Sequence, residues 1–171
     1  MIIRGNSICL GPFDRRHFEA TRTWANDYEL SKLMGRGKPV SEVEHEKWLE
    51  NVLCRDDCVL FAIERPDGKH VGNVWLWHID ARHRSAEVRI VIGDAEHTGR
   101  GIGTEAIRML ADYARDRMNL RRLFALVLST NPRSRRAFEK AGFELEGTLR
   151  QDRWIGDRFV DNWILGRVWT D

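Results

Sequence analysis

The chain has 171 residues, of which 42% are hydrophobic, so it can bury the core of one domain. Its formal net charge is only +2 and its basic and acidic residues are interleaved, which does not indicate a nucleic-acid-binding protein. The first ten residues lack the apolar segment of a signal peptide, no run reaches membrane-spanning length, and three cysteines suit a reducing compartment, so we expect a cytoplasmic protein.

In the first half of the chain, capping and turn residues separate short strands from short helices. The predicted elements are, in order, a strand at Ser7–Pro12, helices over Arg15–Asn26 and Asp27–Met34, a helix that ends near Leu53, and strands at Val59–Glu64 and Val71–Asp80. Asp14 is placed to cap the first helix, and Ser41 and Glu44 have the spacing of a capping box. The turn at 65–68 joins the last two strands into a hairpin.

The second half predicts a strand–helix–strand unit followed by a final hairpin. The predicted elements are a strand at Val88–Ile92, a helix over Ile102–Met118, a strand at Leu123–Leu128, a helix over Pro132–Lys140, and strands at Phe143–Asp152 and Arg158–Val168. Pro132 suits the first turn of its helix, and Gly142 suits the helix end. No linker or repeat divides residues 1–171, so we expect one domain of the α/β class (α+β type). Its sheet should be mixed and mostly antiparallel, with about seven strands flanked by about four helices.

Residues 86–117 contain the pattern with the clearest chemical meaning. A buried apolar strand is followed by Gly99, Gly101 and Gly103, and then by apolar residues at helical spacing. The glycines leave space where the first N–H groups of a helix lack partners and the helix dipole adds partial positive charge. Such a helix start binds phosphate, so the sequence predicts a site for a phosphorylated cofactor.

Several kinds of loop can join a strand to a helix in this way. A Walker-type loop is excluded, because Gly101 is followed by Ile102 and Gly103 rather than by Lys and Ser or Thr. A dinucleotide fingerprint fits G-x-G-x-x-A at 101–106, but Ser-Thr-Asn at 129–131 stands where that motif needs a carboxylate. An ordinary strand-to-helix turn also remains open.

A third kind of phosphate loop fits better. Thr98-Gly-Arg-Gly-Ile-Gly103 resembles the Q/R-x-x-G-x-G/A pyrophosphate loop of the GNAT superfamily of N-acetyltransferases, with Thr98 in place of Gln or Arg. Residues 131–143, NPRSRRAFEKAGF, are similar to the family's N-x-x-S/A…Y-E-K-x-G-F segment, with Phe138 in place of the tyrosine. Residues 146–150 and 157–161 resemble the closing hairpin of a branch that includes ribosomal-protein N-terminal, spermidine and amino-sugar acetyltransferases. The resemblance spans nearly the whole chain. It implies a single GNAT-like domain that moves an acetyl group from acetyl-CoA to a primary amine in a ternary complex.

The resemblance also implies which residues bind acetyl-CoA. They are Ile90, Val91, Ile92, Gly99, Arg100, Gly101, Ile102, Gly103, Thr104, Asn131, Arg136 and Phe138. Main-chain groups of Ile90–Ile92 are implied to contact the pantetheine and the acetyl carbonyl, and the two arginines to reach phosphates. The same residues also suit ordinary roles, as a core strand, as a helix cap at Asn131, and as solvated surface arginines. No histidine or cysteine spacing typical of a metal site is present, so we expect no metal.

Acetyl transfer needs a neutral amine, although a lysine-like amine has a pKa of about 10.4. Glu87, three residues before the cofactor-binding strand segment, is the candidate base, directly or through a water; an ion pair with Arg84 or Arg89 is the alternative. Because Phe138 replaces the family's usual acid, Ser134 or a water is the candidate acid, and Ser134 also suits a polar contact at a helix start. A thiol leaving group with a pKa of about 8.5 needs little assistance.

The acceptor site is expected between the front helices and the end of the strand that bears His78 and Asp80. Five aromatic residues are candidates to line it: Trp24, Tyr28, Trp75, Trp77 and Trp154. Residues 14–51 contain eight acids and seven bases, so no strongly cation-attracting surface is predicted there. We therefore rank a protein N-terminus or a nucleotide-linked amino sugar ahead of a polyamine. A non-catalytic acyl-CoA-binding or sensor domain is the alternative function. We expect no nucleic-acid or membrane partner, and the sequence leaves the oligomeric state open, a homodimer included.

Overall fold

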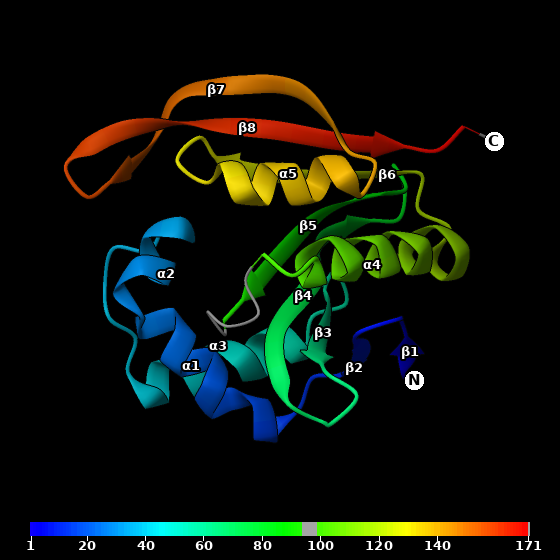
Figure 1. Ribbon diagram of the computed structural model, residues 1–171, viewed down its shortest axis with the longest axis horizontal. Helices are drawn as coiled ribbons and strands as arrows, with labels where there is room; N and C mark the ends of the chain where they lie inside the picture. The colour runs from blue at the N-terminus through cyan, green and yellow to red at the C-terminus, as the bar shows by residue number, and fades with distance from the viewer. Residues whose placement is uncertain (94–98, 171) are drawn as a thin grey trace.

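The computed structural model describes residues 1–93 and 99–170, and over these residues the chain forms one eight-stranded sheet with helices on both faces (Figure 1). The strands are β1 (Ile3–Arg4), β2 (Cys9–Pro12), β3 (Val59–Glu64), β4 (His70–Asp80), β5 (Ser85–Ile92), β6 (Arg122–Leu128), β7 (Glu144–Ile155) and β8 (Arg158–Val168). The helices are the 3-10 turn η1 (Arg15–His17), α1 (Phe18–Asn26), α2 (Tyr28–Leu33), α3 (Glu42–Leu53), α4 (Ile102–Met118) and α5 (Pro132–Lys140). The predicted α+β class and the mixed, mostly antiparallel sheet are confirmed; the short strand β1 was not predicted.

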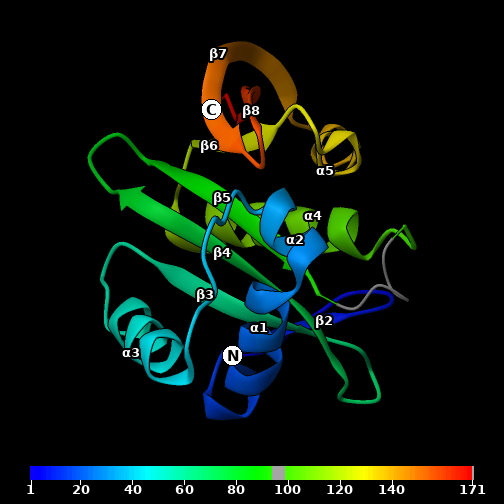
Figure 2. The same cartoon turned by 90° about the vertical axis from the view of Figure 1, so that its left-hand side faces the viewer.

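The sheet order is β1-β2-β3-β4-β5-β6-β8-β7, and in the described part of the chain only β5 and β6 pair in parallel. That pairing ends where Glu87 lies opposite Phe124. Beyond this point β5 remains paired with β4, and β6 remains paired with β8 (Figure 2). We call the diverging segments, residues 88–92 of β5 and 125–128 of β6, the β5–β6 split. Over the described residues, the facing backbone edges of the split have no strand partner, so their N–H and C=O groups are available to a ligand.

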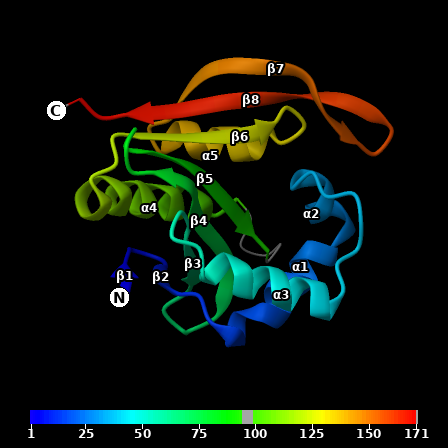
Figure 3. The same ribbon diagram turned by 180° about the vertical axis from the view of Figure 1, so that it is seen from behind.

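The two faces of the sheet carry different layers. Ala86 and Val88 of β5 belong to the main core together with Ile107 and Leu110 of α4. Because strand side chains alternate, Glu87 points to the opposite face, where α1, α2 and α3 lie (Figure 3). The split therefore opens between a layer formed by α4 and α5 and a layer formed by the front helices.

Local capping fixes several of the predicted helix starts. Ser41 Oγ accepts a hydrogen bond from the Glu44 N–H, and the Glu44 carboxylate accepts one from the Ser41 N–H, so the capping box is confirmed. Asp14 caps the 3-10 turn η1, and α1 begins only at Phe18, so the first helix is shorter than predicted. In the part of the chain that the structure describes, none of the helices is long and apolar enough to cross a bilayer.

The final hairpin is longer than predicted and irregular. β7 continues to Ile155, beyond the predicted end at Asp152, and its register with β8 shifts between Leu149 and Arg153. Gln151 has φ +51 within this bulge, and its N–H donates to Asp161 Oδ1 at 2.8 Å. The acceptor of this hydrogen bond lies on the neighbouring strand β8, so the bulge has a tertiary cause.

Candidate active site

The loop before α4 has the geometry of a phosphate site. Gly99 and Gly101 have φ values of +86 and +82, a conformation that favours glycine, and Gly101 is the N-cap of the 17-residue helix α4. Among the described residues, no atom lies within 4 Å of the position that a Cβ would take at either glycine. The first amides of α4 thus lie beside an open space, as the binding of a diphosphate at this helix start would require. Thr98, the departure from the family loop, lies outside the described residues.

Of the remaining predicted cofactor residues at the start of α4, Gly103 lies beside the split. Gly103 lies close to β5, since a Cβ there would be 3.8 Å from Ile92 and 4.0 Å from Ile90. Thr104 follows in the first turn of α4 after the buried Ile102. Arg100 beside the loop is exposed and therefore accessible to phosphate.

On α5, the structure shows the structural roles that the sequence analysis gave as alternatives to acetyl-CoA binding. Asn131 Oδ1 caps the helix by accepting a hydrogen bond from the Ser134 N–H at 3.1 Å, and Arg136 is exposed. Phe138 is 2% exposed and packs edge-on against Phe143, with ring centroids 5.1 Å apart. Contacts of these residues with acetyl-CoA, and an acid role of Ser134, remain predictions.

Glu87 is a buried carboxylate held by one arginine. It is 7% exposed, and Arg89 donates to both of its oxygens, from Nε to Oε1 at 2.8 Å and from Nη2 to Oε2 at 3.0 Å. Arg84, the other predicted partner, instead donates to the backbone O and side-chain Oδ1 of Asn119. The ion-pair alternative therefore holds for Arg89, and a base role of Glu87 remains a prediction.

Trp77 connects this pair to a second arginine. Trp77 lies opposite Glu87 in the β4–β5 ladder, and the Arg89 guanidinium carbon lies 5.1 Å from its ring centroid. Arg55 contacts the same ring at 4.6 Å and forms a bidentate ion pair with Asp57. The Trp77 ring thus contacts two guanidinium groups, of which that of Arg89 binds the buried carboxylate and that of Arg55 binds Asp57.

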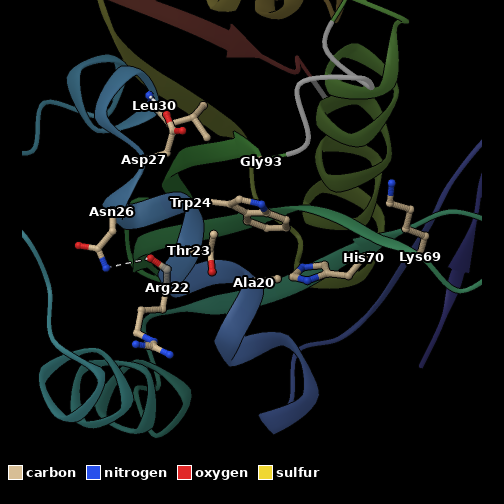
Figure 4. A pocket seen from close by; sticks show the side chains of 10 residues that line it. All are labelled: Ala20, Arg22, Thr23, Trp24, Asn26, Asp27, Leu30, Lys69, His70 and Gly93. Atoms are coloured by element: carbon tan, nitrogen blue, oxygen red, sulfur yellow. Dashed lines mark hydrogen bonds between the residues drawn. The ribbon is translucent and has the colours of Figure 1, made fainter.

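Two cavities lie on the α1–α3 side of the sheet. The larger has a volume of about 800 Å³ and is lined by residues of α1, α2, the β3–β4 turn and the end of β5: Ala20, Arg22, Thr23, Trp24, Asn26, Asp27, Leu30, Lys69, His70 and Gly93 (Figure 4). The Trp24 and His70 rings lie 4.7 Å apart, and a Cβ at Gly93 would overlap the Trp24 ring. A smaller cavity of about 30 Å³ lies between α1, α3 and the sheet and includes Trp24, Trp48 and Trp75.

The predicted acceptor aromatics are therefore not all together. Trp24 and Trp75 share a cavity, whereas Tyr28 and Trp154 are 71% and 58% exposed and Trp77 lies beside Glu87. Among the described residues that line the two cavities, Glu87 is not included. His78 and Asp80 lie at the other, partly exposed end of β4, where His78 is near Asp57 and Asp80 is near His83. The two cavities therefore lie away from the strand end at which the sequence analysis expected the acceptor site.

Sequence reasoning did not identify the buried polar network beside the larger cavity. His17 Nε2 lies 3.1 Å from Glu64 Oε1, and His70 Nε2 lies 2.8 Å from Asn73 Oδ1. The two imidazole rings are 4.6 Å apart, and burial lowers the pKa of His70. These residues come from distant segments, so only the fold brings them together.

Comparison with known proteins places this geometry in a family. The model of the acetyltransferase (GNAT) domain matches residues 7–144. The chain belongs to the GNAT acetyltransferase family. A probable N-acetyltransferase of Bacillus subtilis is 38% identical over 145 residues, which cover 82% of this chain and 74% of that protein.

Several bacterial relatives are named spermidine N(1)-acetyltransferases. The Vibrio cholerae enzyme is 34% identical over 101 residues, 59% of this chain and 58% of that protein, and the Escherichia coli K12 enzyme is 33% identical over 93 residues, 54% and 50% of the two chains. These matches thus span only half to three fifths of the relatives' length. The structure of the V. cholerae spermidine N-acetyltransferase in complex with CoA and spermine superposes with a TM-score of 0.90, at 24% identity and 96% coverage of both chains. This similarity confirms the GNAT fold.

Proposed function

We propose that this GNAT protein transfers the acetyl group of acetyl-CoA to a primary amine by direct attack in a ternary complex. The observation that carries the proposal is the β5–β6 split, which leads from the glycine loop to Glu87. Residues 88–92 extend over about 14 Å, in four steps of about 3.4 Å each. Their unpaired backbone groups suit the amides of a pantetheine arm whose diphosphate lies at the start of α4.

In the proposed reaction the amine nitrogen forms a bond to the thioester carbonyl carbon, and the carbon–sulfur bond breaks. The amine's proton passes to Glu87 or to a water that Glu87 holds, and the CoA thiolate takes a proton from Ser134 or from solvent. A backbone N–H of the split would stabilise the developing oxyanion. With a thiol pKa of about 8.5, the thiolate is a good leaving group, which suits a site with Phe138 in place of tyrosine.

For the acceptor we put a polyamine first, because bacterial relatives are named spermidine N(1)-acetyltransferases. This reverses the order expected from the sequence. The charge distribution supports a second candidate, a protein N-terminus or a nucleotide-linked amino sugar. Arg15 pairs with Glu46 and Glu50, and Lys38 with Glu44, so acids of the front helices are neutralised locally and attract a polycation weakly.

One assay tests the function and the acceptor together. Release of free thiol from acetyl-CoA is measured with spermidine, a peptide with a free N-terminus, and a nucleotide-linked amino sugar, and the product is identified by mass. We expect amine-dependent release, fastest with spermidine. Tight CoA binding without amine-dependent release would instead support the acyl-CoA-binding or sensor domain.

We further propose a homodimer, one of the oligomeric states that the sequence left open, and we retain the predicted cytoplasmic location as a proposal. Trp154 and Phe159, each 58% exposed and in edge-on contact at 4.9 Å, provide apolar surface near the β7–β8 turn for a second copy. Light scattering behind a sizing column measures the mass: a monomer at micromolar concentration would contradict the dimer. The three cysteines of the described chain are free thiols, which suits the cytoplasm.

A further inference from the structure

Arg89 stands out among the arginines near the split because its partner is buried. Most ion pairs of the front helices join two exposed side chains, as Arg15 and Glu46 do at 72% and 46% exposure. The Glu87 side chain is only 9% exposed, whereas that of Arg89 is 42% exposed. A buried carboxylate without a partner is energetically costly, so the ion pair with Arg89 fixes the orientation of the Glu87 side chain.

The orientation of Arg89 is itself fixed. Residues two apart on a strand share a face, which puts Arg89 next to Glu87, and its guanidinium lies 5.1 Å from the Trp77 ring. A planar guanidinium that contacts a ring and binds both carboxylate oxygens has little freedom to rotate. The carboxylate it holds is correspondingly ordered.

The contact leaves part of the carboxylate available. An ionised carboxylate has about four lone-pair sites, and the bidentate contact uses one on each oxygen. We propose that Arg89 is a positioning residue for acetyl transfer, which holds the Glu87 carboxylate oriented so that its remaining lone pairs accept the proton of the acceptor amine or of a bridging water. This inference rests on the proposed function, because it requires Glu87 to act on the amine.

The test uses the full-length protein and steady-state thiol release with the best acceptor of the panel. For Arg89→Gln we expect kcat to fall about 10- to 100-fold, less than the ~10²–10⁴ of a base itself, with KM for acetyl-CoA unchanged. Arg89→Lys retains a positive charge and should restore part of kcat. Because Arg89 acts through Glu87, Arg89→Gln should cause no further loss in a Glu87→Gln background.

Arg55→Gln is the matched control. Arg55 contacts the same Trp77 ring but pairs with Asp57, so this variant should retain kcat within about twofold. Acetyl-CoA-dependent thermal stabilisation shows that each variant is folded, and Arg89→Lys carries the test if Arg89→Gln does not fold.

Three outcomes would overturn the inference while leaving the proposed function intact: unchanged kcat in Arg89→Gln, an equal loss in Arg55→Gln, or a full further loss in the Glu87→Gln background. Absence of amine-dependent thiol release by the unmodified protein would overturn the proposed function, and this inference with it.

Discussion

Replacing Gly101 by alanine separates the cost of backbone strain from the loss of acetyl-CoA binding, because Gly68 provides a matched control. Gly101 has φ +82 and Gly68, on the β3–β4 turn, has φ +83. At both positions none of the described atoms lies within 4 Å of an added Cβ. The two substitutions therefore impose the same strain without a steric clash, and only Gly101 belongs to the loop at the start of α4.

The expected magnitudes follow from this geometry. A left-handed conformation costs a non-glycine residue about 1–2 kcal/mol, which lowers Tm by about 2–8 °C in a protein of this size. Acetyl-CoA at a hundred times its Kd stabilises the native state by about 2.7 kcal/mol, or about 5–11 °C. Both variants should show the lower Tm in the absence of ligand, and only Gly101→Ala should lose the rise with acetyl-CoA, because its methyl group points into the phosphate space.

Thermal unfolding with and without acetyl-CoA measures both effects. If acetyl-CoA raised the Tm of Gly101→Ala as much as that of the unmodified protein, the loop would not be part of the cofactor site. A lost rise in Gly68→Ala as well would show that strain alone abolishes binding.

The other predictions concern Glu87, Phe138 and His45. Glu87→Gln should lower kcat more at pH 7 than near pH 10, where the amine is already largely neutral; equal losses at both pH values would argue against a base role. Phe138→Tyr should change kcat by less than the ~10²–10⁴ of an acid–base group, and an increase of that size would show that the transfer benefits from a phenol. Burial lowers the pKa of His45 from 6.5 to about 4, so the unfolded chain gains a proton between these pH values that the folded protein does not. The free energy of unfolding should therefore fall as the pH falls from about 6.5 to 4, and less steeply in His45→Gln; identical slopes in urea titrations would refute this.

Features of the fold with local causes could be predicted from the sequence. The capping box of Ser41 and Glu44, the Asn131–Pro132 helix start and the positive φ at Gly101 each depend on residues within one turn. The bulge of β7 could not be predicted, because it depends on the hydrogen bond from the Gln151 N–H to Asp161, ten residues away. A contact of Glu105 likewise depends on the fold, because this side chain accepts a hydrogen bond at 3.0 Å from the N–H of Ser7, 98 residues away in the sequence.

In the candidate site, too, the features with local causes could be predicted from the sequence and those that depend on the fold could not. The glycine loop and the strand with Glu87 form one continuous segment, so their order along the site could be predicted from the motif. The sequence analysis left Arg84 and Arg89 open as partners of Glu87. The structure shows Arg89 as the partner, which agrees with strand alternation because residues two apart share a face. The cavity around Trp24 and Trp48 could not be predicted, because α1 and α3 meet there only after folding.

The central claim is that acetyl-CoA lies in the β5–β6 split. Hydrogen–deuterium exchange with and without acetyl-CoA tests it, because the amides of residues 88–92 that face β6 have no strand partner in the described chain. We expect new protection in peptides covering 88–92 and 99–104, and little change in peptides of β7. Protection confined to the helices around the larger cavity, with β5 and the glycine loop unchanged, would contradict the account.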